Sequence, residues 1–222
     1  MKKSKNKTKR EPLSRLWFLG HGFHPVPSTE YTDFKILYAH ESDLRFVNQY
    51  GQNVPPEFNP AKRDPKKHHG HGTPCLRNYG NRCCHILRAL AFYGPRPTYV
   101  TKKGTIRPCE CHHLNGDLED HRKANILAWL SRPIHDIANA RQDALQTIVP
   151  NQDLRGFDYA ILCELQDPRT MSDADFETRM EYLRIMHECD FDPRIFPAAR
   201  MHEFFAMPLD EFKTLMYHQK FD

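Results

Sequence analysis

The sequence predicts an α+β protein with a β-rich N-terminal region and a helical C-terminal region. Short aromatic and β-branched runs between residues 16 and 50 favour strands. Apolar residues at helical spacing predict a helix over 86–92, and the same spacing returns beyond residue 150. A chain of 222 residues can bury one sizeable core and a small second one.

The N-terminal third contains three runs that favour strands. They are Arg15–Leu19, Asp33–Ala39 and Leu44–Tyr50. The stretch 51–74 is crowded with proline, glycine and basic residues, which predicts a long loop. Thr73–Leu76 and Arg82–His85 then flank a segment rich in asparagine and glycine, as expected for a hairpin.

The central third alternates between strands and helices. The helix over 86–92 ends at Gly94-Pro95, and a basic loop is expected over 98–107. A short strand is expected at 108–113, followed by a turn, and a helix at 134–148.

The last third is expected to be helical. Ser172 and Asp175 can form a capping box before a helix that runs to about Glu188. A last helix is expected from about Pro208 to about His218. These elements divide the chain into an unstructured basic arm (1–15), a β-rich region with a basic loop (16–70), a central domain (71–149) and an acidic helical region (150–222).

Charge is distributed unevenly along the chain. Residues 151–222 hold 8 Lys or Arg against 15 Asp or Glu, a net charge of −7, whereas residues 1–150 hold 24 against 13, a net charge of +11. A basic segment of this kind suits a polyanionic partner, because each neutralised phosphate releases counterions. A solvated surface with an ordinary excess of lysine is the alternative explanation.

Seven cysteines, an odd number, do not indicate a disulfide framework and predict a reducing compartment. The basic N-terminus is followed by no apolar segment typical of a secretory signal, and no run of 18 apolar residues predicts a membrane span.

Residues 109–141 carry the chemistry that the sequence suggests. His112 and His113 are adjacent on the expected strand, so their rings point to opposite faces. One can bind a metal ion while the other handles a proton. His135 falls at the start of a helix, where its ring can point back at the strand. Two imidazoles with open positions suit a divalent ion that also holds a phosphate oxygen.

This segment resembles the HNH family, in particular the branch found in phage and intron-borne homing endonucleases. The residues that carry the resemblance are His112-His113, Gly116, Asp120, Arg122, Asn125-Ile126, Trp129 and His135, with upstream support from Gly72–Leu76, Gly80, His85–Leu87, Ala91-Phe92 and Gly94-Pro95. The resemblance covers about residues 70–145 and implies a central ββα-metal unit. It also implies a metal-dependent endonuclease that hydrolyses DNA, with RNA as an alternative substrate, in the cytoplasm of a bacterial or phage-infected cell.

The resemblance implies a role for each matching residue. His113 would be the general base that activates water, and Asn125 would orient the His113 ring. His112 and His135 would hold the metal ion, and the products would be a 5′-phosphate and a 3′-hydroxyl. Because the spacing between Asn125 and Trp129 is one residue longer than the family pattern, Asp136 and Asn139 are alternatives to His135 as the last ligand.

The metal and the nucleic-acid contacts are less sharply defined. Mg²⁺ or Mn²⁺ is expected, with Zn²⁺ or Ni²⁺ as alternatives because imidazoles favour later transition metals. The basic residues expected to contact the nucleic-acid backbone are Lys66, Lys67, Arg96, Lys102, Lys103 and Arg122.

Two further functions remain open. Cys75, Cys84, Cys109 and Cys111 could gather around a structural zinc ion, which would make the chain a zinc-stabilised interaction protein. The chain could also keep the HNH scaffold, bind nucleic acid and lack cleavage activity. Neither the oligomeric state nor the role of residues 151–222 follows from the sequence.

Overall fold

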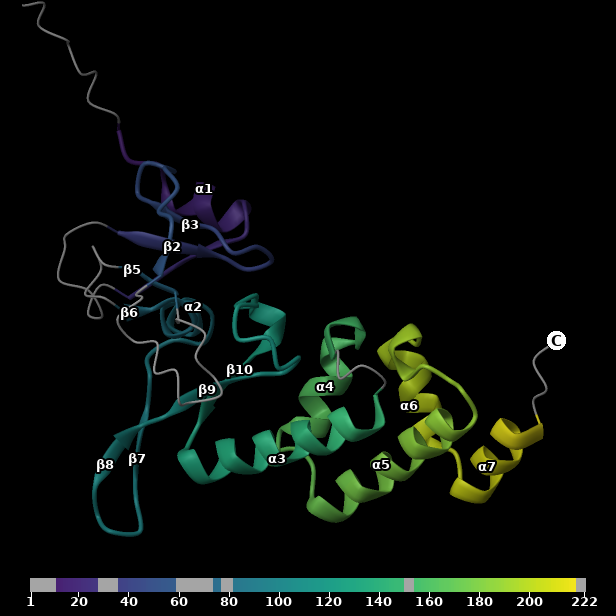
Figure 1. The fold of residues 1–222 in the computed structure, drawn as a ribbon. Coiled ribbons are helices and arrows are strands. Elements are labelled where there is room, and N and C mark those ends of the chain that lie inside the picture. Colours follow the sequence, from purple (N-terminus) through teal and green to yellow (C-terminus); the bar gives the residue numbers. More distant parts are fainter. Residues whose placement is uncertain (1–10, 28–35, 59–73, 77–81, 150–153, 219–222) are drawn as a thin grey trace, which may run out of the picture. The chain divides into compact units, whose positions relative to one another are not determined.

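The computed structural model describes residues 11–27, 36–58, 74–76, 82–149 and 154–218. The described chain combines small antiparallel sheets with helices, which confirms the α+β class (Figure 1). It divides into two units, one formed by residues 1–95 with 121–123 and the other by 96–120 with 124–222. Among the described residues, no helix has the length and apolar character needed to span a bilayer.

The described residues of the first unit form two antiparallel sheets and two helices. One sheet has the order β1 (Phe23–Pro25), β2 (Leu37–His40) and β3 (Phe46–Asn48). The other has the order β4 (Glu57–Phe58), β5 (Pro74–Leu76) and β6 (Arg82–Cys83). The helices are α1 (Arg15–Gly20) and α2 (Cys84–Tyr93).

A buried arginine connects helix α2 to the β2–β3 turn in the first unit. Arg88 of α2 has no exposed surface, and its guanidinium donates hydrogen bonds to the backbone carbonyls of His40, Asp43 and Arg45. The same group lies 4.7 Å from the centroid of the Phe46 ring. A buried charge is tolerated where its donors find acceptors, so Arg88 connects α2 to the β2–β3 turn.

One predicted strand in this unit is wrong, because residues 15–19 form helix α1. The Ser14 hydroxyl accepts a hydrogen bond from the Trp17 backbone N–H and so caps the helix. Only Phe18 is buried, where it stacks on Tyr38 with ring centroids 3.8 Å apart, while Leu16 is 81% exposed. The Ser14 cap therefore favours a helix over residues whose apolar pattern predicted a strand.

The second unit begins with two antiparallel strand pairs. The first pair is β7 (Thr98–Val100) with β8 (Ile106–Pro108), and the second is β9 (Glu110–His113) with β10 (Ile126–Leu130). The basic loop predicted over 98–107 is thus a hairpin. Thr101 N–H donates to Thr105 O across its end, and Gly104 adopts a φ of +76° that favours glycine.

Five helices complete the second unit. They are α3 (Arg132–Ile148), α4 (Tyr159–Gln166), α5 (Asp173–Glu188), α6 (Ala198–Ala206) and α7 (Leu209–His218). The predicted helices at 134–148, 172–188 and 208–218 correspond to α3, α5 and α7. Ser172 caps α5 as expected, because its hydroxyl accepts from Asp175 N–H.

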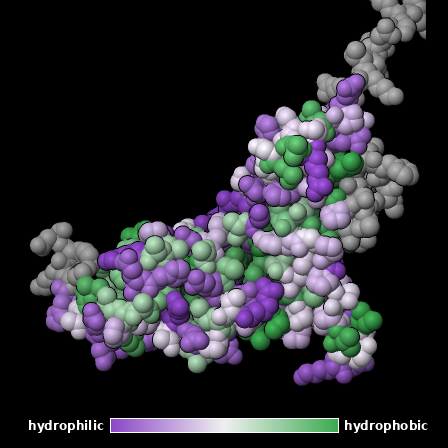
Figure 2. Space-filling model, turned by 180° about the vertical axis from the view of Figure 1, so that it is seen from behind, coloured by the Kyte–Doolittle hydropathy of each residue, from purple (hydrophilic) through white to green (hydrophobic). Residues whose placement is uncertain are grey.

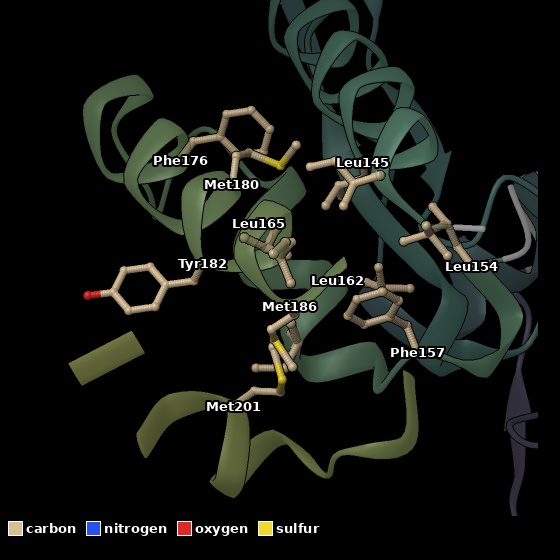
Figure 3. Close-up of a cluster of buried hydrophobic side chains, with 14 of the residues drawn as sticks. Leu145, Leu154, Phe157, Leu162, Leu165, Phe176, Met180, Tyr182, Met186 and Met201 are labelled. Atoms are coloured by element: carbon tan, nitrogen blue, oxygen red, sulfur yellow. The ribbon is translucent and has the colours of Figure 1, made fainter. Parts of the chain in front are cut away.

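One hydrophobic core joins the strand pair to all five helices. It includes Leu127 of β10 and Phe212 of α7. Figure 3 shows part of this core, with Leu145 of α3, Leu162 of α4 and Met186 of α5. The structure therefore divides the chain after residue 95. The sequence-based boundary after residue 149 falls inside this common core.

Candidate functional site

Strands β9 and β10 and helix α3 follow one another in the second unit as a ββα arrangement (Figure 1). His113 pairs with Ile126 and His112 with Leu127 across the two strands. Helix α3 begins after Ser131, with a proline in its first turn, and this places His135 near the helix start.

The rings of His112 and His135 meet between β9 and α3. Their centroids are 5.5 Å apart in an edge-to-face arrangement. Glu110, on the same face of β9 as His112, places a carboxylate oxygen 3.2 Å from His135 Nδ1. Asn139 lies one helical turn beyond His135, with Nδ2 3.5 Å from His135 Nδ1, and its side chain also hydrogen-bonds to His112.

Gln166 of α4 determines which nitrogen of His112 carries the proton. The Gln166 Nε2 group donates to Leu114 O at 2.7 Å, so its Oε1 atom faces His112 Nε2 at 2.6 Å. Since Oε1 is only an acceptor, His112 Nε2 must be the donor. The neutral ring then keeps its lone pair on Nδ1. A carboxamide from α4 therefore selects the tautomer of a histidine on β9.

Burial keeps both imidazoles neutral. Burial lowers the pKa of His112 below its ordinary value, and the Gln166 hydrogen bond opposes this effect. Burial also lowers the pKa of His135, while the neighbouring Glu110 carboxylate pulls it the other way. A histidine must be neutral to bind a metal ion, so the desolvation of this pair favours the ligand form.

His113 lies on the opposite face of β9 from His112, as strand alternation requires. It is 7% exposed, and its backbone carbonyl accepts a hydrogen bond from Gln142 Nε2 at 2.6 Å. Gln142 of α3 also donates to Leu114 O at 3.2 Å. The backbone on either side of His113 is thus held by α3 while its ring projects away from that helix.

Asn125 has a different contact from the one that the sequence predicted. Its side-chain oxygen accepts from Asn115 N–H at 2.9 Å, and its side-chain nitrogen donates to Asp120 O at 2.7 Å. Both polar atoms thus brace the loop between β9 and β10. The hydrogen bonds of the Asn125 side chain thus go to the loop backbone.

The same loop is tied to α4. The Asp120 carboxylate accepts from Asn115 Nδ2 and from the Tyr159 hydroxyl, both at 2.9 Å. Asp120 is 8% exposed, so these donors compensate for a buried charge. The loop between β9 and β10 is therefore held by a hydrogen bond within the loop and by another from Tyr159 of α4.

Of the three residues considered as the last ligand, His135 and Asn139 lie beside His112. Asp136 points elsewhere, because its side chain is 55% exposed and forms an ion pair with Arg132 at 2.9 Å. Among the described residues, no three His, Cys, Asp or Glu side chains gather into a metal-binding group. The donors that converge here are two imidazoles, the Asn139 carboxamide and, beside His135, the Glu110 carboxylate.

The four cysteines proposed as zinc ligands are divided between the two units. Cys84 belongs to the first unit, and Cys109 and Cys111 to the second, while the side chain of Cys75 lies outside the described residues. Burial raises the pKa of Cys109, and raises that of Cys111 to about 12. In the metal-free protein this environment favours the neutral thiol form of both residues.

The basic residues predicted to bind nucleic acid have different surroundings. Lys102 and Lys103 are exposed at the end of the β7–β8 hairpin. Arg96 is half-buried, where Nε donates to Cys109 O, and its guanidinium lies 5.9 Å from the centroid of the Trp129 ring. Arg122 is half-buried and belongs to the first unit. Lys66 and Lys67 lie outside the described residues.

Sequence reasoning missed Gln142, Tyr159 and Gln166, which hold the site from α3 and α4. Gln166 lies 54 positions from His112 in the chain. The only signal in the sequence is a polar residue at the end of an apolar helical run, and that pattern is too common to identify a partner. When the chain is compared with protein-family models, with curated proteins and with solved structures, nothing matches.

Proposed function

We propose that this protein hydrolyses phosphodiester bonds of DNA with the help of a divalent metal ion. The observation that carries the proposal is the pair of neutral imidazoles, the buried His112 and the half-buried His135, that converge between β9 and α3. The adjacent His113 projects from the other face of the same strand. One strand thus carries a group suited to hold an ion and a group suited to move a proton.

The donor set is chemically suited to an ion. His112 Nδ1 and His135 supply imidazole nitrogens, and the side-chain oxygen of Asn139 is a third candidate donor. This set leaves positions for water and for a phosphate oxygen. Nitrogen-rich sites favour Mn²⁺, Zn²⁺ or Ni²⁺ over Mg²⁺, which prefers oxygen ligands.

The protein groups would divide the reaction between them. His113 takes a proton from the water that attacks phosphorus, a task suited to imidazole because its ordinary pKa lies near neutral pH. His112 and His135 would hold the ion, which would supply stabilisation of the negative charge that develops during hydrolysis. The water oxygen bonds to phosphorus as the bond from phosphorus to the 3′ oxygen breaks. The leaving oxygen takes a proton from solvent, so that a 5′-phosphate and a 3′-hydroxyl result.

The environment of the thiols is compatible with this proposal. The described cysteines are free, as is usual in the reducing cytoplasm, where a nucleic-acid substrate is at hand.

The test is cleavage of supercoiled plasmid by the wild type, His113→Ala and a control, His202→Ala, with Mg²⁺, Mn²⁺, Zn²⁺ or EDTA. His202 is a suitable control because it is exposed on α6 and pairs only with Glu164. We expect metal-dependent cleavage by the wild type and the control, and a rate about 10²–10⁴-fold lower for His113→Ala. Cleavage in EDTA, or full activity of His113→Ala, would contradict the proposal.

One observation favours a second function. The His112 ring is 3% exposed and already hydrogen-bonds to Gln166, as expected of a histidine that only stabilises the fold. The chain would then bind nucleic acid without cutting it. In that case the protein would bind DNA with a steep salt dependence and would cleave it with none of the metals. Comparing this DNA with an RNA of the same sequence shows which nucleic acid the protein prefers.

A further inference from the structure

The β7–β8 hairpin is largely exposed within the second unit: Tyr99 of β7 is half-buried and the other residues of the two strands are exposed. Val100 is 68% exposed and Ile106 66%, and the two residues are direct partners across the strands. Figure 1 shows the hairpin extending away from β9, and Figure 2 shows hydrophobic surface on this projection beside a hydrophilic end. An isolated two-stranded hairpin is at best marginally stable in water, so a partner surface against its exposed residues would stabilise it.

The end of the hairpin presents two lysines in a defined turn. Thr101 N–H donates to Thr105 O, and Gly104 N–H donates to Thr101 O, both at 2.9 Å. Lys102 and Lys103 occupy the turn between these bonds. The segment 97–108 contains a third cation, Arg107, and no acidic residue. Its charge therefore complements a polyanion.

The base of the hairpin is joined to the candidate site. Cys109 N–H donates to Pro97 O, and Arg96 donates to Cys109 O and approaches Trp129 of β10. From Ile106 to His112 the six steps of chain span at most about 22 Å. That is less than one helical turn of duplex DNA, about 34 Å.

We infer that the β7–β8 hairpin is a ribbon that enters the major groove of duplex DNA and positions it at the candidate site. The major groove admits a two-stranded β-ribbon. Lys102 and Lys103 contact phosphates at the groove edge, and the Val100–Ile106 pair supplies apolar contact to base edges. This inference rests on the proposed function and specifies how its substrate is held.

The experiment measures binding of a fluorescent 30-base-pair duplex by anisotropy, with the full chain in EDTA, over a range of salt concentrations. Two hairpin double variants are compared, Lys102→Ala with Lys103→Ala, and Val100→Ser with Ile106→Ser. The charge-matched control is Arg184→Ala with Lys213→Ala, on α5 and α7, where both cations already pair with carboxylates. Circular dichroism establishes that each variant is folded.

The two hairpin variants should differ in how they lose affinity. Loss of two phosphate contacts should reduce the slope of log affinity against log salt by about 2. The apolar variant should bind more weakly at every salt concentration with an unchanged slope. A dye that fills the major groove should compete with the wild type, and a minor-groove dye should not. Hairpin variants that bind like the control, or competition by the minor-groove dye alone, would overturn the inference.

These outcomes are distinct from failure of the proposed hydrolysis. Loss of affinity in both hairpin variants, together with a wild type that never cleaves, would support DNA binding by the hairpin and contradict the proposed hydrolysis. Normal cleavage by hairpin variants that bind like the control would support the proposed hydrolysis and contradict DNA binding by the hairpin. The inference would also be contradicted if the wild type bound single-stranded DNA or an acidic protein more tightly than duplex DNA.

Discussion

The strand pair β9–β10 and the helices α5–α7 belong to one unit but bury different kinds of side chain. Between residues 112 and 125 the buried polar residues of this unit are His112, His113, Asn115, Asp120 and Asn125. No described residue of α5, α6 or α7 is a buried polar or charged one, and the same helices bury Phe, Met, Leu, Ile and Tyr side chains. Burial of polar groups is costly and therefore needs specific partners.

This difference indicates a division of labour. The helical region contributes apolar stabilisation, whereas the strand pair holds polar groups in a set arrangement. Between the two regions lies α4, whose Tyr159 and Gln166 reach the polar residues of the strand pair. The acidic C-terminal region thus acquires a structural role, because it anchors the loop and the His112 ring.

The largest expected effect is on stability in the apolar region. Phe212→Ala, at a position of α7 with no exposed surface, should lower the free energy of unfolding by about 3–5 kcal/mol. Tyr217→Ala, 55% exposed on the same helix, should cost less than about 1 kcal/mol. Urea unfolding measures both. Equal losses would show that α7 is not part of the common core.

A smaller effect on stability is expected from the loop of the strand pair. Asn125→Ala leaves Asn115 N–H and Asp120 O without their partner, and we expect a loss of about 1–3 kcal/mol in total. Asn125→Asp keeps the acceptor and should lose only part of this. Thermal unfolding and cleavage are measured together. Lost cleavage at unchanged stability would instead support the original prediction that Asn125 orients His113.

The link between the two regions is tested at Gln166. Gln166→Leu should weaken binding of Mn²⁺ or Zn²⁺ about 10–100-fold, as is usual when the partner of a histidine ligand is removed. Imidazole ¹⁵N NMR without metal should show the proton of His112 on Nε2 in the wild type and a mixture of tautomers in the variant. Gln146→Leu, on α3 near Gly116, is the matched control. A wild-type proton on Nδ1 would refute the role of Gln166.

The smallest expected effect is the pH dependence of stability. Because burial lowers the pKa of His112, the unfolded chain binds this proton more readily than the folded one. Stability is therefore complete above the ordinary histidine pKa and falls as the pH drops through it, until the folded-state pKa is reached. Between pH 7.5 and 5.5 we expect a loss of at most about 1.4 kcal/mol from this residue.

Urea unfolding in EDTA measures this pH dependence, and His112→Gln should remove the contribution of this histidine. His135 contributes in the same direction, since burial lowers its pKa too. A wild type that becomes more stable as the pH falls over this range would contradict the assignment of both rings as buried and neutral.

Local sequence patterns predicted the elements whose ends carry recognisable capping or turn residues. Ser172 with Asp175 marks the start of α5, and the order of strand, turn and helix around His112 follows from the sequence. Strand alternation also placed His112 and His113 on opposite faces. Where two local preferences competed, as in residues 15–19, the pattern of apolar residues misled, because the Ser14 cap outweighed it.

Short-range chemistry thus defines the α+β class, the principal helices and the candidate residues His112, His113 and His135. The Gln166 carboxamide that selects the His112 tautomer and the core shared with residues 150–222 arise only when distant segments pack together. A hydrogen bond across 54 positions depends on where α4 lies against β9. Hydrophobic burial, which is not directional, brings these elements together, and local sequence patterns do not encode the partners that then meet.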